Sequence, residues 1–327
     1  MRGPIRARRP RILCTRRLTE RTLDRLTESF ELDVHDSDAP LSRDRFLARA
    51  DGVDGIVATL ADRVDSELLQ RAGPELRVVA NFAAGLDNVD VEAATARGVL
   101  VANTPGAVTR PTAELALALT LTLLRRIAEG DRLLRRRVAW EWTPTWMLGS
   151  GLEGRTFGVI GFGRIGREAA RLASAFGMTV VSTRRSGRSD PASVPLDDLL
   201  VRADVVSLHC PLTPETRHLI DTRAMSLMKP TAVIVNTSRG PVVDERALVA
   251  AIQEHRIAGA ALDVFEFEPE VAAELLELEN VVLTPHLGGA TWEAREAMGA
   301  QCADALEAVL IERVEPINVV NGSIRRA

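Results

Sequence analysis

A glycine-rich segment near the middle of the chain constrains the fold more than any other feature. It reads Gly158-Val-Ile-Gly161-Phe-Gly163-Arg-Ile-Gly166, between a strand-like run that begins at Phe157 and a helical pattern that ends at Phe176. In a strand–turn–helix of this kind, the first glycine of GxGxxG permits a tight turn, the second lets backbone approach a pyrophosphate, and the third lets helix and strand pack closely. The segment predicts a dinucleotide-binding loop on a parallel sheet; the alternative is a glycine-rich turn without a ligand.

Strand-like and helical patterns alternate over most of the chain. Apolar runs rich in β-branched residues, separated by amphipathic stretches, indicate parallel strands covered by helices on both faces. The first four predicted strands are Arg11–Thr15, Gly55–Ala58, Arg77–Asn81 and Val99–Ala102. The later ones are Phe157–Gly161, Thr179–Ser182, Val205–His209, Ala232–Asn236, Gly259–Val264 and Val281–Leu283. The two runs of strands predict two α/β units.

Two helices are expected to bound the second unit. The first opens near Thr112–Glu114, where Pro111 suits a helix start, and continues through Arg126 or beyond as a connector between domains. The second is expected over Trp292–Arg313, at the end of the chain. The predicted fold class is therefore α/β, with two Rossmann-like or flavodoxin-like parallel-sheet domains and an active-site cleft between them.

Composition excludes several classes of protein. The net charge is −4, and no basic helix motif is present, so we expect no nucleic-acid partner. The three cysteines, Cys14, Cys210 and Cys302, are far apart and form no CxxC pair, which excludes a disulfide scaffold and a cysteine-rich metal site and favours a reducing cytoplasm. The longest apolar run, Leu115–Leu124, is shorter than the roughly 18 residues of a membrane span.

The end of the predicted Thr179–Ser182 strand bears on which dinucleotide is bound. An acidic residue about 20 positions after the glycine loop normally accepts from the ribose 2′-hydroxyl, whereas arginine suits a 2′-phosphate. Here no acid appears before Asp190, and the selector positions are Ser182, Thr183, Arg184 and Arg185. Guanidinium and hydroxyl groups can bind the 2′-phosphate that a carboxylate would repel. We predict NADP(H), with NAD(H) as the second choice; the alternative is that arginine is simply abundant in this chain.

Three further polar segments follow predicted strands. Arg239, Glu268 and His286 lie in them, and ligands bind at the carboxyl ends of strands in an open parallel sheet. An arginine can hold a carboxylate with its planar fork, and a histidine oriented by a carboxylate can donate a proton near neutral pH. The alternatives are that Arg239 is a surface arginine, and that Glu266 rather than Glu268 is the acid.

Five motifs in order resemble the D-isomer-specific 2-hydroxyacid dehydrogenase family, and the resemblance runs from about Ile12 to Ile317. They are the glycine loop, His209-Cys-Pro-Leu-Thr-Pro-Glu-Thr216, Ser238-Arg239-Gly240, Asp263-Val-Phe with Glu268-Pro269, and Pro285-His286-Leu-Gly288. The resemblance implies that Arg239, Glu268 and His286 are catalytic. Formate dehydrogenases of the same superfamily carry glutamine in place of the glutamate, so Glu268 argues against them.

The resemblance also implies binding residues. Ala84 and Gly85 match the loop that offers backbone amides to a substrate carboxylate; the alternative is an ordinary strand–helix turn. Trp142 matches a tryptophan that reaches the active site of the neighbouring subunit in a homodimer, although the spacing of the first tryptophan departs from that pattern. The implied cofactor-binding residues are Thr112, Gly161, Gly163, Arg164, Ile165, Gly166, Ser182, Thr183, Arg184, Arg185, His209, Cys210, Pro211, Thr237, Ser238, Asp263 and Gly288.

Together these features predict a reductase most like the glyoxylate/hydroxypyruvate reductases. Residues 108–291 would form the dinucleotide-binding domain, and residues 1–107 with 292–327 the substrate-binding domain. A hydride from NADPH would reduce a small 2-oxo acid to the D-2-hydroxy acid, with no metal. Two alternatives remain: an NAD-linked dehydrogenase of the D-lactate, phosphoglycerate or phosphonate type, and a non-catalytic dinucleotide sensor similar to transcriptional corepressors.

Overall fold

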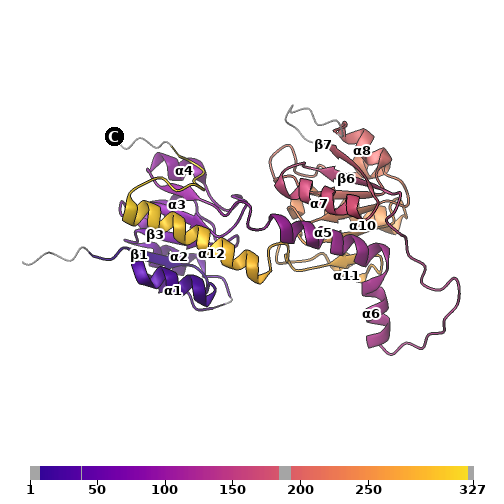
Figure 1. Ribbon diagram of the computed structural model, residues 1–327, viewed down its shortest axis with the longest axis horizontal. Coiled ribbons are helices and arrows are strands. Elements are labelled where there is room, and N and C mark those ends of the chain that lie inside the picture. The colour runs from indigo at the N-terminus through magenta and orange to yellow at the C-terminus, as the bar shows by residue number, and fades with distance from the viewer. Residues whose placement is uncertain (1–7, 38, 184–192, 323–327) are drawn as a thin grey trace, which may run out of the picture. The chain divides into compact units, whose positions relative to one another are not determined.

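The computed structural model describes residues 8–37, 39–183 and 193–322. The chain divides into two compact units, one made of residues 1–107 with 291–327 and the other of residues 108–290 (Figure 1). Each unit is built around one parallel sheet. Among the described residues, no helix is long and apolar enough to cross a membrane.

The first unit contains a five-stranded parallel sheet with strand order β2-β1-β3-β4-β5. Its strands are β1 (Arg11–Cys14), β2 (Glu31–Val34), β3 (Gly55–Ala58), β4 (Val78–Asn81) and β5 (Leu100–Ala102). Its helices are α1 (Glu20–Ser29), α2 (Arg43–Ala50), α3 (Ser66–Ala72), α4 (Val91–Ala96) and α12 (Trp292–Glu307), followed by a π-helical turn, Ala308–Glu312. The central strands β3 and β4 are completely buried, as their uninterrupted apolar sequences predict.

Strand β2 is a strand that the sequence patterns did not predict. Its sequence, Glu-Leu-Asp-Val, holds two acids in four residues, and none of its residues is fully buried. Among the described residues it pairs only with β1, from Arg11 opposite Glu31 to Cys14 opposite Val34. An edge strand needs no continuous apolar run, because only one of its sides is paired and its faces are partly open to water.

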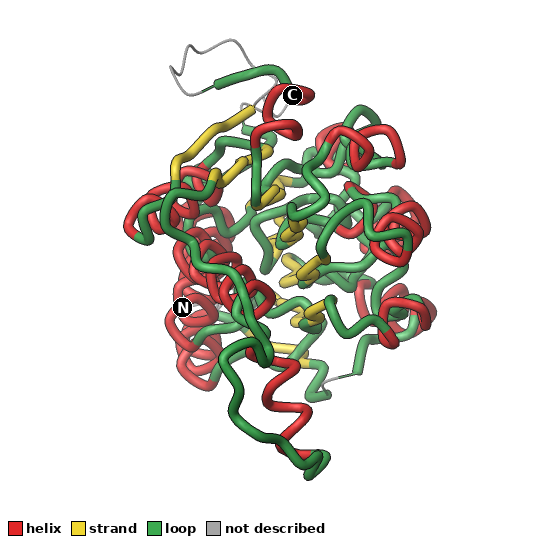
Figure 2. Tube along the Cα trace, turned by 90° about the vertical axis from the view of Figure 1, so that its right-hand side faces the viewer, coloured by secondary structure: helices red, strands yellow, loops and turns green. Residues whose placement is uncertain are grey.

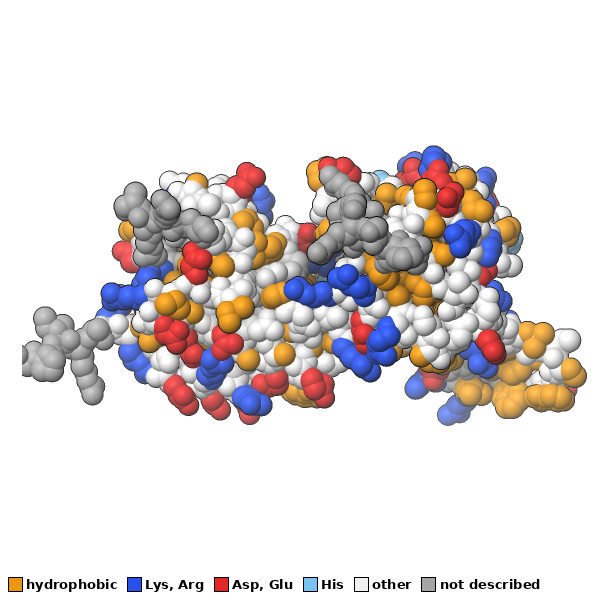
Figure 3. Space-filling view, turned by 45° about the horizontal axis from the view of Figure 1, so that its top comes forward, with side chains coloured by type: hydrophobic (Ala, Val, Ile, Leu, Met, Phe, Trp, Pro, Cys, Tyr) orange, Lys and Arg blue, Asp and Glu red, His pale blue; other side chains and the backbone are white. Residues whose placement is uncertain are grey.

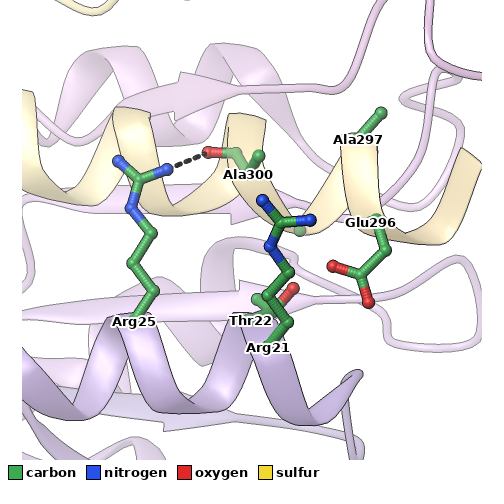
Figure 4. A pocket seen from close by; sticks show the side chains of 7 residues that line it. Arg21, Thr22, Arg25, Glu296, Ala297 and Ala300 are labelled. Carbon is green, nitrogen blue, oxygen red and sulfur yellow. Dashed lines mark hydrogen bonds between the residues drawn. The ribbon is translucent and has the colours of Figure 1, made fainter. Parts of the chain in front are cut away.

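Helices α1 and α12 pack closely against each other in the first unit. A Cβ on Gly299 of α12 would lie 2.0 Å from Oγ1 of Thr22, so a larger residue would force the helices apart. A shallow pocket opens beside this contact, and Arg25 reaches across it to the carbonyl of Ala300 (Figure 4). Arg25 also binds Asp304 and Glu307, so its guanidinium is occupied by the protein itself.

The second unit contains a six-stranded parallel sheet with strand order β11-β10-β9-β8-β6-β7. Its strands are β6 (Thr156–Ile160), β7 (Thr179–Thr183), β8 (Val205–Leu208), β9 (Val233–Asn236), β10 (Gly259–Leu262) and β11 (Val281–Leu283). Its helices are α5 (Thr109–Leu124), α6 (Ile127–Arg135), α7 (Arg164–Ala175), α8 (Leu196–Arg202), α9 (Thr222–Leu227), α10 (Glu245–Gln253) and α11 (Ala273–Glu277), with a 3-10 turn at Gly240–Val242.

Helices cover both faces of this second sheet (Figure 2). The core on one face is formed with α5 and α7, and the core on the other with α8, α9 and α10. The chain leaves β6 for β7 on one side and later returns to place β8 on the other side of β6. The strand order therefore reverses between β6 and β8, and such a switch point is where open α/β sheets bind ligands.

The long helix predicted to continue through Arg126 is shorter than expected. It begins at Thr109 and ends at Leu124. Arg126 adopts a left-handed conformation with φ 52°, and its guanidinium binds Glu129 in the first turn of α6. The Arg125–Arg126 pair thus separates two helices, since a left-handed residue cannot continue a right-handed helix.

Candidate active site

The glycine loop after β6 has the geometry that its motif predicts. Gly161 has φ 93°, and a Cβ there would lie 2.5 Å from the backbone nitrogen of Cys210, which follows β8. A Cβ on Gly166 would lie 2.2 Å from the carbonyl oxygen of Gly161. A Cβ on Gly163 would meet no atom within 4 Å. The first and third glycines are therefore required by protein packing, whereas Gly163 leaves open space at the N-terminus of α7, where a phosphate would be stabilised by amides and the helix dipole.

Three buried polar atoms of this unit lack hydrogen-bond partners among the described residues. Oγ of Ser182, Nδ1 of His209 and Oγ1 of Thr237 are shielded from solvent and have no hydrogen-bond partner within the described part of the chain. They lie at or just after the carboxyl ends of β7, β8 and β9. A buried polar group without a partner is costly, so these atoms fit a polar ligand at this edge of the sheet. Together with the open space at Gly163, they fit a dinucleotide.

His209 is held in its neutral form. Burial lowers the pKa of its imidazole to about 4, and Nε2 lies 2.8 Å from Oγ of Ser207. Burial also raises the pKa of the neighbouring Cys210 thiol to about 11, so this cysteine is not a thiolate at neutral pH. Cys210 packs in the hydrophobic core beside the glycine loop.

The other residues expected to bind the dinucleotide lie around the same edge. The carbonyl of Thr183 accepts from the N–H of Gly161 at 3.0 Å. Ser238 donates from its side chain to Asn236 at 2.8 Å, and the carbonyl of Pro211 accepts from Thr216 at 2.7 Å. Arg164 is exposed and Ile165 half-buried in the first turn of α7. Arg184 and Arg185, on which the NADP(H) prediction rests, lie outside the described residues.

Asp263, directly after β10, fixes the segment that carries His286. Its carboxylate accepts from Oγ1 of Thr284 at 2.7 Å, the N–H of Leu287 at 2.7 Å and the N–H of Gly288 at 2.8 Å. The N–H of His286, which has φ 56°, donates to the carbonyl of Asp263 at 2.8 Å. Asp263 thus fixes the backbone of the loop on which His286 adopts its left-handed conformation.

Thr112, on α5, reaches the same loop. Its Oγ1 donates to the carbonyl of Gly288 at 2.9 Å. A Cβ on Gly288 would lie 3.3 Å from both Thr112 and Asp263, so a side chain there would crowd both. Thr112 and Gly288 were expected to contact a cofactor, and the structure brings them together with Asp263.

His286 and Glu268 form a hydrogen-bonded pair. Nδ1 of the imidazole lies 2.9 Å from Oε2 of Glu268, and Oε1 accepts from the N–H of Phe265 at 3.0 Å. Burial acts to raise the pKa of the Glu268 carboxyl, but the hydrogen bond and charge of His286, the Phe265 N–H and the charge of Arg239 together hold that pKa below its usual value. Glu268 is therefore ionised at neutral pH, and its carboxylate faces Nδ1 of the ring.

Glu266, the alternative acid, binds elsewhere. One of its carboxylate oxygens lies 2.7 Å from Nε2 of His218 and 3.1 Å from the guanidinium of Arg217. Within the part of the chain that the structure describes, only Glu268 pairs with His286. Glu268, and not Glu266, is therefore the glutamate that is hydrogen-bonded to His286.

Arg239 follows β9, and the next residue, Gly240, determines how closely the ends of β9 and β10 pack. Nη1 of Arg239 donates to the carbonyl of Ser238 at 2.7 Å. A Cβ on Gly240 would lie 1.9 Å from the carbonyl carbon of Phe265. The backbone that carries Arg239 therefore packs directly on the backbone that leads to Glu268, and only glycine permits that contact.

Glu245 is a further residue of this site that the sequence patterns did not indicate. It lies at the start of α10 and is 6% exposed, and its carboxylate accepts from the N–H of Glu266 at 2.5 Å. Burial, together with the charges of Glu266 and Glu268, raises the pKa of its carboxyl. Acidic residues are common in the first turn of a helix, so the sequence around Glu245 did not indicate that its carboxylate is buried against this loop.

The residues expected to bind substrate lie on the first unit and on an exposed segment of the second. Ala84 and Gly85 follow β4, at the carboxyl end of that strand, where Ala84 is exposed. Trp142 is 77% exposed, between Trp140 and Trp146, whose rings stack with centroids 5.4 Å apart. Among the described residues no group of three or more histidine, cysteine or acidic side chains could hold a metal ion.

Comparison with known proteins shows where this architecture belongs. Residues 117–288 match the family described as D-isomer specific 2-hydroxyacid dehydrogenase, NAD binding domain. The chain belongs to the D-isomer-specific 2-hydroxyacid dehydrogenase family. Its nucleotide-binding match covers the sheet that carries the glycine loop, Arg239, Glu268 and His286, so the family relationship and the geometry concern the same part of the molecule.

Several curated relatives share nearly the whole length of this dehydrogenase. It is 43% identical to the glyoxylate reductase of Pyrococcus furiosus, over 94% of both chains. It is 45% identical to the glyoxylate reductase of Korarchaeum cryptofilum, over 97% of both. The chain is thus a 2-oxo acid reductase by family.

Solved structures agree with this relationship. A protein of Thermus thermophilus superimposes with a TM-score of 0.91 at 43% identity, covering 95% of this chain and 99% of that one. An NADPH-dependent glyoxylate/hydroxypyruvate reductase of Sinorhizobium meliloti, solved with NADP and malonate, gives a TM-score of 0.82 at 36% identity, covering 98% and 99%.

Proposed function

We propose that this dehydrogenase reduces glyoxylate or hydroxypyruvate with NADPH. The observation that carries the proposal is the hydrogen bond between His286 and an ionised Glu268, at the same sheet edge as Arg239 and the glycine loop. A proton donor, a cation and a dinucleotide loop at one edge are the groups that reduction of a 2-oxo acid needs. The glyoxylate reductases among its relatives support the choice of substrate.

Each residue has a separate task in this reaction. The nicotinamide, when bound, supplies a hydride to the carbonyl carbon of the substrate. His286 donates a proton from Nε2 to the carbonyl oxygen, so that the C=O bond becomes CH–OH. Glu268 holds the ring through Nδ1 and stabilises its protonated form. Arg239 binds the substrate carboxylate and the keto oxygen, and stabilises the negative charge that develops on that oxygen.

The first unit supplies further donors in this proposal. The backbone amides of Ala84 and Gly85 would bind the substrate carboxylate. These amides carry no formal charge. They would select the position of the carboxylate, whereas Arg239 would supply the positive charge that attracts it. In a 2-oxo acid the carboxylate and the keto group are adjacent, so the amides and Arg239 could bind them at the same time.

The choice of NADPH rests on the selector residues of the sequence. Ser182 is buried with an unpartnered Oγ, and Thr183 lies at the end of the same strand. Arg184 and Arg185 follow in the sequence, where an NAD-binding relative would carry an acid. The Sinorhizobium meliloti relative is NADPH-dependent, which supports the same preference.

Initial rates with glyoxylate, hydroxypyruvate and pyruvate, each with NADPH and with NADH, test this proposal. We expect kcat/KM with NADPH to exceed that with NADH by at least about tenfold, the equivalent of about 1.4 kcal/mol. We also expect glyoxylate or hydroxypyruvate to exceed pyruvate. A preference for NADH would contradict the cofactor assignment alone. Tight dinucleotide binding without turnover of any of the three acids would instead favour a sensor.

We further propose a homodimer formed through the second unit. Helix α6 buries none of its residues. Large apolar side chains are exposed along it and the loop that follows, and they gather at the lower right of Figure 3. These residues are Ile127, Leu134, Val138, Trp140, Trp142, Trp146 and Leu148. A contiguous apolar surface of this kind is typical of an interface between subunits.

Light-scattering mass measurements test the dimer. The wild-type protein should have twice the 35.5 kDa mass of one chain. Leu134→Asp should shift it toward the monomer, because a charge would be buried at the interface. Leu276→Asp is the matched control, since Leu276 is also an exposed leucine on a helix of this unit, 65% exposed against 58% for Leu134. A dimer in both variants would contradict this interface.

We place the enzyme in the cytoplasm. All three cysteines, Cys14, Cys210 and Cys302, are buried free thiols. Burial raises the pKa of each thiol, so none is poised for oxidation. This usage fits a reducing compartment.

A further inference from the structure

Three consecutive carbonyls in the loop after β4 are held by the protein. The carbonyl of Ala83 accepts from the N–H of Thr104 at 2.9 Å. The carbonyl of Ala84 accepts from Nδ2 of Asn103 at 2.7 Å, and that of Gly85 from Nδ2 of Asn81 at 2.9 Å. Three peptide planes in succession are thus fixed by partners from β4 and from the segment after β5.

The amides of the same loop are left unpaired. The N–H groups of Ala84 and Gly85 donate to no acceptor among residues 8–37, 39–183 and 193–322. In a trans peptide the carbonyl of one residue and the N–H of the next point in opposite directions within one rigid plane. The bond from Thr104 to Ala83 therefore sets the direction of the Ala84 N–H. The bond from Asn103 to Ala84 likewise sets the direction of the Gly85 N–H.

Asn103 is itself fixed by the C-terminal segment. Its backbone N–H donates to the carbonyl of Asn318 at 3.3 Å, and Nδ2 of Asn318 donates back to the carbonyl of Asn103 at 2.5 Å. The side chain of Asn103 thus projects from a backbone that is held on both sides. Its amide does not contribute to the core, because its bond to Ala84 is exposed to solvent.

We propose that Asn103 is a positioning residue that aims the Gly85 N–H at the substrate carboxylate. The proposal rests on the proposed function, in which this loop binds the carboxylate. The hydrogen bond from Asn103 to the Ala84 carbonyl also polarises the peptide between Ala84 and Gly85. This polarisation makes the Gly85 N–H a stronger hydrogen-bond donor. Asn103 therefore acts on both the direction and the strength of the Gly85 donor without touching the substrate.

Asn103→Leu tests this role, since leucine has a similar size but cannot donate to the Ala84 carbonyl. We expect the Kd of oxalate for the enzyme–NADPH complex, measured by calorimetry, to rise about tenfold, and the KM for glyoxylate to rise with it. The Kd of NADPH should stay within about twofold of wild type. Asn103→Gln keeps an amide donor and should recover part of the oxalate affinity.

Asn280→Leu is the matched control. Nδ2 of Asn280 donates to the carbonyl of Ala258 at 2.8 Å, also exposed, so the variant removes the same kind of bond elsewhere. It should leave oxalate binding unchanged, and the two leucine variants should lose similar thermal stability. Oxalate binding by Asn103→Leu equal to wild type would overturn the inference while leaving the function intact. A wild-type protein that neither binds oxalate nor reduces glyoxylate would overturn both.

Discussion

Replacing His286 by asparagine should lower kcat/KM for glyoxylate reduction by about 10²–10⁴-fold, the usual contribution of a positioned general acid. Asparagine suits this site because it tolerates the left-handed backbone of His286, φ 56°, but it cannot donate a proton at neutral pH. Steady-state rates with saturating NADPH measure the effect. The Kd of NADPH should change little, because the proposed reaction has the ring donate to the substrate and not to the dinucleotide.

His255→Asn is the control for this prediction. His255 has almost the same backbone conformation, φ 57°, but follows α10 at the opposite end of the strands from the glycine loop. Replacing His255 should leave kcat/KM within about twofold of wild type. The variant thus measures separately how much activity is lost when asparagine replaces histidine at a left-handed position. If His286→Asn retained turnover within about threefold of wild type, another group would have to supply the proton.

The partner of His286 gives a related expectation for pH dependence. The pKa of the Glu268 carboxyl lies below its usual value, so the carboxylate is charged throughout the neutral range and loses its charge only in acid. Glu268→Gln removes this titrating group but keeps an oxygen that can accept from Nδ1 of His286. The fall in kcat/KM for reduction that follows protonation of Glu268 in acid should therefore be absent from the pH profile of the variant.

Much of this site could be predicted because parallel sheets place the ends of their strands together. Arg239, Glu268 and His286 are far apart in sequence. Each of them nevertheless follows a strand that could be predicted from its apolar sequence. The glycine loop was equally predictable, since Gly161 and Gly166 are required by close backbone contacts. The residue types alone left Glu266 and Glu268 open, because both follow the same strand. The resemblance implies Glu268, and the hydrogen bonds place Glu268 rather than Glu266 beside His286.

Other features depend on contacts that no local pattern encodes. Strand β2 carries two acids and gains its place only by pairing with β1. Asn103 looks like an ordinary loop asparagine, and its role emerges only when Ala84 and Asn318 are brought beside it. Glu245 is buried because it accepts from the N–H of Glu266, 21 residues away. In each case the partner lies on another element, so the sequence around the residue is uninformative.

Replacing Arg239 by alanine should lower kcat/KM for glyoxylate by about 10³-fold and raise KM, since both the substrate carboxylate and the developing charge on the keto oxygen lose their cation. Arg239→Lys should fall between alanine and wild type, because lysine keeps the charge but cannot form two parallel hydrogen bonds to a carboxylate. Steady-state rates and the Kd of NADPH measure these effects. Arg256→Ala is the control, since Arg256 pairs with Glu254 on the surface.

Chemical rescue separates a catalytic role of Arg239 from a structural one. The Arg239→Ala variant should regain part of its activity when guanidinium chloride is added at concentrations too low to unfold it, because the free ion can occupy the space of the missing group. Gly240 packs on the backbone of Phe265, so the alanine variant keeps the strand ends together and leaves that space in place. A loop that had collapsed or misfolded would gain nothing from the ion. Rescue by guanidinium, and not by ammonium of equal charge, would assign the effect to the planar fork of the guanidinium rather than to charge alone.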